Sequence, residues 1–248
     1  MPAAPGRSGD HAPLLAEATR LGDTAATMRV KKKAGYHHGD LRRALMDLSV
    51  DVIRKQGVEA LNLRALAKRL EVSSGAPYQH FANRADLLAA IAQEGFERLL
   101  QDMASSRDAA PAEAGARLQA VGLAYVQFAG RHPGHFRVMF LADAHGAQSQ
   151  ALSATSRQAF DLLWQAVDEC QREGVAPPGE PGLLTLTAWS LVHGLASLWA
   201  DGALPARGGR LDPATMAPQV TGLLRQMFES LGSGVTRKAA SSPAPHGP

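Results

Sequence analysis

The stretch that most constrains the fold is residues 63–88, LRALAKRLEVSSGAPYQHFANRADLL, where two short helical patterns flank a turn. In the first pattern, apolar residues recur at i, i+3, i+4 and i+7 after Asn62, a residue type that favours helix starts. The second pattern begins at Ser73, a cap candidate, with Pro77 in its first turn, where a missing N–H costs least. Such a pair predicts a helix-turn-helix, whose second helix enters the major groove of DNA.

Helical periodicity continues on both sides of this stretch, and no sustained period-2 alternation indicates a strand. Asp40 is predicted to cap a first helix ending near Gln56, and Asn83 to cap a long helix ending near Ala104, before the polar link SSRDAAPAE. Further helices are predicted at about 113–131, 133–142, 147–173, 181–200 and 212–231. The predicted fold is all-α, with an N-terminal three-helix helix-turn-helix DNA-binding domain and a C-terminal helical effector and dimerisation domain.

Composition sets the expected boundaries. Residues 1–34, which are basic and rich in Ala, Pro and Gly, and residues 233–248 are expected to be disordered tails. Residues 35–95 are predicted to form the DNA-binding domain and residues 105–232 the ligand-binding and dimerisation domain. Met28, directly before RVKKKAGYHHGD, is an alternative start of the chain. With neither a secretory signal pattern nor an uncharged apolar run of membrane length, the expected address is cytoplasmic, without a membrane partner.

Positive charge is concentrated in one part of the chain. The whole chain carries a net charge of +3, but residues 29–84 hold twelve Lys and Arg against five Asp and Glu. Such asymmetry fits a DNA-binding segment joined to a neutral or acidic body, although an ordinary basic surface remains an alternative.

Within the predicted recognition helix, Pro77 and Phe81 are expected to face inward and the other side chains to face DNA. Gln79 can pair with adenine and Ala76 can touch a thymine methyl group, while Tyr78 and His80 suit phosphates. The alternative is a generic helical hairpin whose aromatic residues are core. The candidate contacts with a double-stranded DNA operator are Lys32, Lys33, Arg42, Ser73, Ser74, Gly75, Ala76, Tyr78, Gln79 and His80.

Residues 35–91 resemble the DNA-binding domain of the tetracycline-repressor (TetR) family of bacterial transcription regulators, most specifically in VSSGAPYQHFANRADLL. The resemblance implies phosphate and base contacts at Ser74, Gly75, Ala76, Tyr78 and His80, and core positions at Leu70 and Phe81. Many relatives carry Leu at the position of Pro77. Pro77 of this chain has no N–H, so one backbone hydrogen bond is lost there. AWSLVHGLASLWADG, residues 188–202, resembles the Trp-x-x-x-His-Gly signature of one type of TetR regulatory domain. That resemblance implies a helical domain that dimerises through its last two helices and often encloses a small-molecule pocket.

Two apolar stripes on the helix predicted at 181–200 require cover on two faces. One stripe is Leu184, Ala188, Leu191, Leu195 and Leu198, and the other is Trp189, Val192, His193, Ala196 and Trp199. The final helix, with Asp212 as cap and Pro213 first, adds Val220, Leu223, Leu224, Met227 and Leu231. Together they predict a four-helix seam in a two-fold homodimer, against the alternative of a larger monomer core.

An effector pocket is predicted among the aromatic residues of the C-terminal part, although aromatic and Met stripes are more often core packing. His193 could bind an effector or titrate, but a core histidine is the commoner case. Cys170, the single cysteine, excludes an internal disulfide, and a passive role is expected rather than thiol sensing. The candidate ligand residues are Tyr125, Phe128, Phe136, Met139, Phe140, Phe160, Trp164, Trp189 and His193.

No sequence motif indicates an enzyme, a cofactor or a metal site. P-loop, GxSxG, HExxH and GxGxxG patterns are absent. The nearest imitation of a site, HPGHF at residues 132–136, has no obvious acidic partner in the sequence. The predicted function is a repressor released from a palindromic operator by an unknown small-molecule effector. An architectural DNA-binding dimer without effector, or an activator, are the alternatives.

Overall fold

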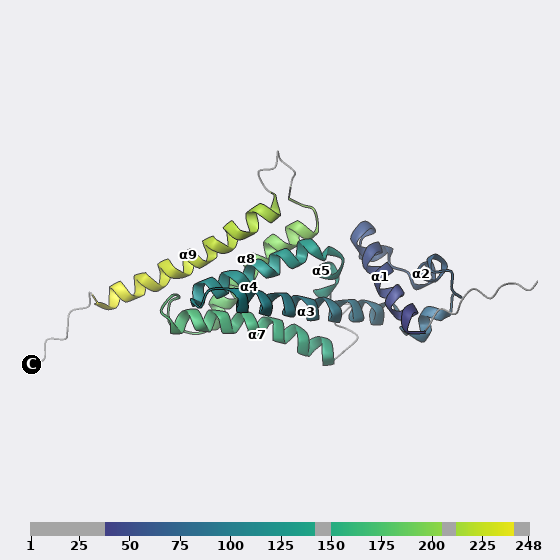
Figure 1. Ribbon diagram of the computed structural model, residues 1–248, viewed down its shortest axis with the longest axis horizontal. Helices are drawn as coiled ribbons and strands as arrows, with labels where there is room; N and C mark the ends of the chain where they lie inside the picture. Colours follow the sequence, from purple (N-terminus) through teal and green to yellow (C-terminus); the bar gives the residue numbers. More distant parts are fainter. Residues whose placement is uncertain (1–37, 142–149, 205–211, 241–248) are drawn as a thin grey trace, which may run out of the picture. The chain divides into compact units, whose positions relative to one another are not determined.

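The computed structural model (Figure 1) describes residues 38–141, 150–204 and 212–240, all within one unit, Tyr36–Pro248. Every regular element in these ranges is helical, which confirms the all-α prediction. The elements are α1 (His38–Gln56), the 3₁₀ turn η1 (Val58–Ala60), α2 (Leu63–Arg69), the 3₁₀ turn η2 (Ala76–Gln79), α3 (Arg84–Ala109), α4 (Ala114–Arg131), α5 (Pro133–Met139), α7 (Gln150–Arg172), α8 (Pro181–Ala200) and α9 (Pro213–Ala240).

The N-terminal three-helix unit is fixed by its caps and a small core. Asn62 Oδ1 accepts hydrogen bonds from the N–H groups of Arg64 and Ala65, at 2.9 and 3.2 Å, and Asn83 accepts from Asp86 N–H at 2.9 Å. Both predicted caps are confirmed. The fully buried core side chains of this unit include Leu45, Ile53, Leu66, Leu87 and Leu88.

Helix α3 runs without a break through the segment predicted as a link between two domains. It ends at Ala109, so the predicted helix end near Ala104 is wrong. Serines are only mildly unfavourable in helices, and Arg107 Nη2 donates a 2.6 Å hydrogen bond to Glu169 Oε1 of α7. Because α3 packs on α1 at one end and on α4 and α7 further along (Figure 1), one rigid element belongs to both halves of the protein.

Helix α4 lies at the centre of the C-terminal body, in contact with α3, α5, α7, α8 and α9. Its approach to α8 is close, because a Cβ atom on Gly130 would lie 2.4 Å from the ring of Trp199. The short helix α5 approaches α1 in the same way, since a Cβ atom on Gly134 would lie 2.6 Å from the carbonyl oxygen of Val50. These glycines set the spacing between neighbouring helices.

Several predicted helix ends differ from the structure. Helix α1 begins at His38, two residues before the predicted cap Asp40, and α5 ends at Met139 rather than near residue 142. Helix α9 continues to Ala240, past the predicted end near residue 231 and into the segment predicted as a disordered tail. Gly232 does not stop α9, because it is a packing glycine: a Cβ atom there would lie 2.8 Å from the carbonyl oxygen of Val175. Residues 1–34 and 241–248 lie outside the described ranges.

The predicted start of α9 is confirmed. Asp212 Oδ2 accepts hydrogen bonds from the Thr215 N–H and hydroxyl, at 3.0 and 2.7 Å, and Pro213 is the first residue of the helix. The hydrogen bonds to Thr215 lower the pKa of the Asp212 carboxyl group, so the cap is ionised at neutral pH.

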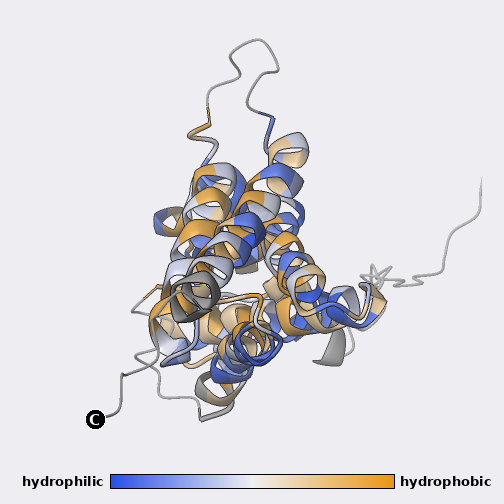
Figure 2. Cartoon of the chain, turned by 90° about the vertical axis from the view of Figure 1, so that its left-hand side faces the viewer, coloured by the Kyte–Doolittle hydropathy of each residue, from blue (hydrophilic) through white to orange (hydrophobic). Residues whose placement is uncertain are grey.

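Helix α8 is apolar on two faces, as predicted, but the faces divide differently. Figure 2 shows how hydrophobic and hydrophilic residues are distributed over the helices. Ala188 is buried, whereas Leu191 and Leu198, predicted on the same stripe, are exposed. By length and composition alone α8 is, among the described residues, the one helix that could span a membrane. Its contacts with α4, α5, α7 and α9 identify it as part of the helical body. Its exposed leucines are Leu183, Leu186, Leu191 and Leu198.

Candidate nucleic-acid interface and ligand cavity

The predicted recognition helix is a four-residue 3₁₀ turn, η2, rather than an α-helix. The carbonyl oxygen of Ser73 accepts a 3.0 Å hydrogen bond from Ala76 N–H at the start of the turn. The residue at the N-cap position is Gly75, so no side chain caps the turn. The prediction that the Ser73 side chain caps a helix here is therefore wrong. Pro77 has no N–H to donate, and Tyr78 N–H bonds back three residues to Gly75, which is the 3₁₀ pattern.

Most of the side chains that the sequence predicted to face outward are exposed on this turn, with Ala76 and His80 as the exceptions. Pro77 and Phe81 are buried against the three-helix core, as predicted. Tyr78 is 45% exposed. Ala76 and His80 are half-buried, and His80 Nε2 is a buried atom with no hydrogen-bond partner in the described part of the chain. The other exposed candidates are Ser73, Ser74, Gly75 and Gln79.

Two basic side chains flank this turn. Arg42, exposed on α1, lies with its guanidinium carbon 4.9 Å from the centre of the Phe81 ring, and its Nη1 is 3.2 Å from the Met46 sulfur. Arg64, near the N-terminus of α2, lines a surface hollow together with Tyr78 and Arg84. Sequence reasoning missed Arg64, although its position two residues after the Asn62 cap is the signal that could have found it. Lys32 and Lys33 lie outside the described residues.

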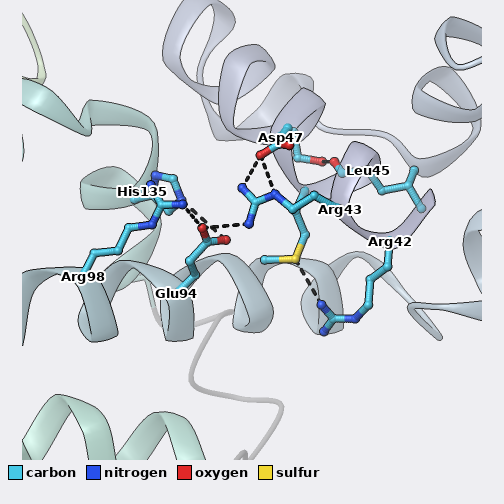
Figure 3. A network of polar contacts seen from close by, with 9 residues as sticks. Arg42, Arg43, Leu45, Asp47, Glu94, Arg98 and His135 are labelled. Carbon is cyan, nitrogen blue, oxygen red and sulfur yellow. Dashed lines mark hydrogen bonds and ion pairs between the residues drawn. The ribbon is translucent and has the colours of Figure 1, made fainter. Parts of the chain in front are cut away.

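A polar network joins α1 to α3 and α5 (Figure 3). Glu94 of α3 accepts a 2.9 Å hydrogen bond from Arg43 of α1 and forms an ion pair with Arg98. His135 of α5, buried, has its Nε2 3.9 Å from Glu94 Oε2. The sequence showed no acidic partner for HPGHF, and the structure corrects that interpretation by placing Glu94 beside His135. Among the described residues, no group of three or more His, Cys, Asp or Glu side chains could hold a metal ion.

Burial and the two arginines determine which groups of this network are charged: Glu94 is ionised and His135 is neutral. Hydrogen bonding to Arg43 and the charges of both arginines lower the pKa of Glu94 against the opposing effect of burial. Burial lowers the pKa of His135 to about 4, so the imidazole is neutral at neutral pH. The site is therefore an anion between two guanidinium groups beside a neutral ring.

Arg137 of α5 makes a second junction, between α1 and α8. Its guanidinium donates to the carbonyl oxygens of Ile53 and Arg54, at 3.3 and 3.1 Å, in the last turn of α1. It also donates to the carbonyl oxygen of Ala200 at 2.5 Å, at the end of α8, and to Asp201 at 3.3 Å. A cation at the carbonyl ends of two helices stabilises both.

An apolar cavity of about 230 Å³ lies within the C-terminal body. Four of the candidate ligand residues line it: Tyr125, Phe140, Phe160 and Trp189. Its wall is completed by residues of α3 and α7 that the sequence did not single out, because a mostly apolar helix face looks the same whether it lines a cavity or fills a core. These residues are Phe96, Leu99, Met103, Ser156, Ala159 and Leu163.

The remaining predicted ligand residues do not line the cavity. Phe128 and Met139 are fully buried core residues, Phe136 packs its ring edge-on to Tyr125, and Trp164 lies beside Phe160. His193 does not line the cavity but contacts one of its lining residues, since its Nδ1 lies 2.8 Å from the Tyr125 hydroxyl oxygen.

Cys170 has the passive environment that was expected. It is fully buried, and burial raises the pKa of its thiol to about 12. The thiolate form that reacts with oxidants is therefore negligible at neutral pH.

Known proteins match both halves of the chain. Residues 45–91 match the family described as bacterial regulatory proteins, tetR family, and residues 118–229 match the tetracyclin repressor-like C-terminal domain. The HTH-type nicotine-responsive transcriptional repressor HdnoR of Paenarthrobacter nicotinovorans is 34% identical over 64 residues, which is 26% of this chain and 33% of HdnoR. The chain covers 33% to 59% of the length of the curated relatives that it matches.

Two solved structures share the fold over most of its length. A protein of unknown function from Rhodococcus sp. RHA1 is 31% identical, with a TM-score of 0.65 over 80% of this chain and 98% of that one. AibR in complex with isovaleryl coenzyme A and operator DNA is 19% identical, with a TM-score of 0.60 over 76% of this chain and 98% of that one, a likeness of fold. With both family matches on one all-α chain, the protein belongs to the TetR family of bacterial DNA-binding transcriptional regulators.

Proposed function

We propose that the protein is a homodimeric transcriptional repressor that leaves a near-palindromic operator when a small molecule binds its C-terminal body. The observation that carries this proposal is α3. Its N-terminal turns pack against the DNA-facing unit, and its middle supplies Phe96, Leu99 and Met103 to the apolar cavity. A ligand that displaces those side chains acts on the same rigid element that supports the DNA-facing turn.

DNA reading is proposed for the exposed turn. Gln79 reads a base edge, with Gly75 and Ala76 allowing close approach, and Tyr78 and His80 contact phosphates. Arg42 and Arg64 flank the turn and add positive charge to it, together with Ser73, Ser74, Lys32 and Lys33. Neighbouring protomers would place two such turns in successive major grooves, which is why a two-fold protein requires a near-palindromic site.

Dimerisation is proposed through α8 and α9. Leu183 and Leu186 of α8 are 73% and 51% exposed, and Leu223 and Leu231 of α9 are 58% and 51% exposed. Large apolar side chains gathered on two helices of a soluble regulator mark an interaction surface. A two-fold pairing of these helices would bury them and would account for the membrane-like composition of α8. Such a regulator acts on the chromosome, in the cytoplasm.

The cavity favours an effector-responsive regulator over an architectural DNA-binding dimer, because a protein that only dimerises needs no internal space. AibR, which shares the fold, has been solved in complex with both isovaleryl coenzyme A and operator DNA, which supports a separate ligand site and DNA site here. The protein would act by binding, with no catalytic step.

The test is a binding titration at fixed salt on DNA from upstream of the protein's own gene, beside a scrambled duplex of equal length. A preference of roughly a thousandfold or more for the native DNA is expected of a specific autoregulator. Equal, salt-sensitive binding to both duplexes would favour the architectural alternative. An activator would bind as specifically but would raise transcription in a reporter assay, which the repressor lowers.

A further inference from the structure

We propose that the apolar cavity takes an uncharged, mainly apolar ligand about the size of a bicyclic aromatic ring system, and that it rejects carboxylates and the charged part of coenzyme A thioesters. The inference rests on the proposed function in treating this cavity as the effector site. It names the chemical class of effector, which the proposed function leaves open.

Among the described residues, those that line the cavity carry no charged side chain. Its ten lining residues come from α3, α4, α7, α8 and the residue after α5, and none of them is Lys, Arg, His, Asp or Glu. Eight are purely hydrocarbon, thioether or indole side chains, and the two hydroxyl groups belong to Tyr125 and Ser156. An anion buried here would lose its hydration without gaining a cationic partner, which costs several kcal/mol or more.

His193, which contacts Trp189 and Tyr125 of the wall, does not supply that missing charge. His193 lies behind the wall, and burial lowers its pKa, so its ring is neutral at neutral pH. Burial raises the pKa of Tyr125, which therefore keeps its proton, and its hydroxyl oxygen lies 2.8 Å from His193 Nδ1, within hydrogen-bond distance. A neutral phenol can exchange a hydrogen bond with a polar atom of a ligand, but it offers an anion no positive charge. This arrangement favours a neutral ligand over a carboxylate.

Size restricts the ligand further. An apolar cavity of about 150 Å³ accommodates benzene, and this one, at about 230 Å³, is roughly half as large again. Two fused rings, or a short branched chain, would fill it. A coenzyme A thioester could place only its acyl end inside, and its phosphates would have to remain in solvent.

Aromatic rings make up much of the wall and would stack on a planar ligand. Trp189 is the centre of the aromatic side, with the rings of Phe160 and Phe140 at 6.3 and 6.4 Å between centroids. The Phe160 ring meets Trp189 edge-on and the Phe140 ring is tilted against it, and such aromatic surroundings suit an aromatic guest. Trp189 also provides a readout, because a ligand beside its indole changes its fluorescence.

The experiment compares ligands that differ in charge on the full-length protein. Binding of quinoline, indole and indole-3-carboxylate, and of coenzyme A and isovaleryl-coenzyme A, is measured by calorimetry without DNA. Indole is the sharpest probe, because indole-3-carboxylate differs from it only by the charged group. We expect indole to bind more than about tenfold tighter than indole-3-carboxylate and either coenzyme A compound. Tighter binding of the carboxylate or the thioester, or no binding of either neutral bicycle at millimolar concentration, would overturn the inference.

Two matched variants locate the binding site. Ala159→Met adds three heavy atoms to a residue that lines the cavity, whereas Ala154→Met makes the same change at an exposed position on the same helix, away from it. Indole binding should be lost in the first variant and kept in the second. Equal binding by both would show that indole sits elsewhere. If Ala159→Met does not fold, the comparison of charged and neutral ligands on the unaltered protein still decides.

Operator binding is measured separately, so that the two proposals fail differently. Indole that binds in the cavity but leaves operator affinity unchanged would support the ligand class and contradict effector-controlled release. A coenzyme A thioester that releases the operator while indole does not bind would support effector control and contradict the ligand class.

Discussion

Pro77 decides the geometry of η2, the turn proposed to read DNA. Without its N–H, the segment from Ala76 to Gln79 forms a 3₁₀ turn, and its buried ring fixes the turn to the core below. The two exposed side chains that follow Pro77 in the sequence have different expected partners. Tyr78 shares a hollow with Arg64 and Arg84, which suits a phosphate, while Gln79 is free to meet a base edge.

Substitutions at these two neighbours should separate affinity from specificity. Tyr78→Phe removes one hydroxyl donor and is expected to weaken binding to operator and random DNA alike, by about 1 kcal/mol. Gln79→Ala is expected to cost about 1–3 kcal/mol on the operator and to relax the preference at one base pair. Titrations on operator variants with single base changes measure both effects. Equal losses on operator and random DNA for Gln79→Ala would remove its base-reading role.

His135 should make stability depend on pH. Its pKa in the folded protein, about 4, lies below the ordinary 6.5, so the unfolded chain takes up a proton first as the pH falls. The stabilisation is complete above pH 6.5 and is lost as the pH falls towards 4. Between pH 6.5 and roughly 5 the free energy of unfolding should drop by about 2 kcal/mol on account of this residue.

The control is His135→Gln, which keeps a polar side chain without a titrating ring. Urea unfolding of both proteins across this pH range gives the difference due to His135 alone, because His132 and His193 titrate in both. Parallel curves for the two proteins would show that His135 is not buried in neutral form.

At the scale of secondary-structure elements, local signals predicted helix starts better than helix ends. Asn62, Asn83 and Asp212 cap their helices as expected, because a cap is a contact between neighbours in the sequence. The continuation of α3 to Ala109 and the passage of α9 through Gly232 depend on partners distant in the sequence, such as Glu169 and Val175. The cavity was predictable only in part for the same reason: Tyr125, Phe140, Phe160 and Trp189 were candidates, whereas Phe96 and the other wall residues of α3 and α7 have no local signal that separates a cavity wall from core packing.

Helix α5 is positioned to carry a change in the cavity to the DNA-facing unit. Phe140 follows α5 and lines the cavity, while Arg137 binds the last turns of α1 and α8. Arg137→Met keeps the aliphatic stem but removes every hydrogen bond of the guanidinium. We expect a loss of about 1–3 kcal/mol in stability, with ligand affinity unchanged and ligand-induced release of the operator reduced.

Arg131→Met is the matched control for that change. Arg131, on α4, is 54% exposed and pairs with Asp102, so its removal should cost no more than about 1 kcal/mol. Calorimetry with ligand and operator titration with and without ligand measure the two properties separately. If operator release is the same in Arg137→Met and in Arg131→Met, α5 does not carry the signal through Arg137.

At the scale of the whole molecule, the proposed DNA binding and the proposed dimerisation depend on one another. A single four-residue turn offers few base contacts, so specific affinity requires two turns held at a fixed separation. Once the first turn is bound, the second then binds as an intramolecular event. The protomer cannot supply that separation alone. The exposed leucines of α8 and α9 are the apolar surface available for holding a second copy.

Introducing charge into that surface should therefore dissociate the dimer and weaken operator binding. Leu186→Glu on α8 and Leu223→Glu on α9 change side chains that are 51% and 58% exposed, so the fold of each protomer should survive. In a two-fold interface each substitution appears twice, and burying both carboxylates is expected to give a monomer in sedimentation. Operator affinity should then fall by at least about a hundredfold. Gln101→Glu, an exposed position on α3, adds the same charge elsewhere and should change neither property. Variants that remain dimeric would place the seam on another surface, whereas monomeric variants with full operator affinity would contradict the requirement for two paired turns.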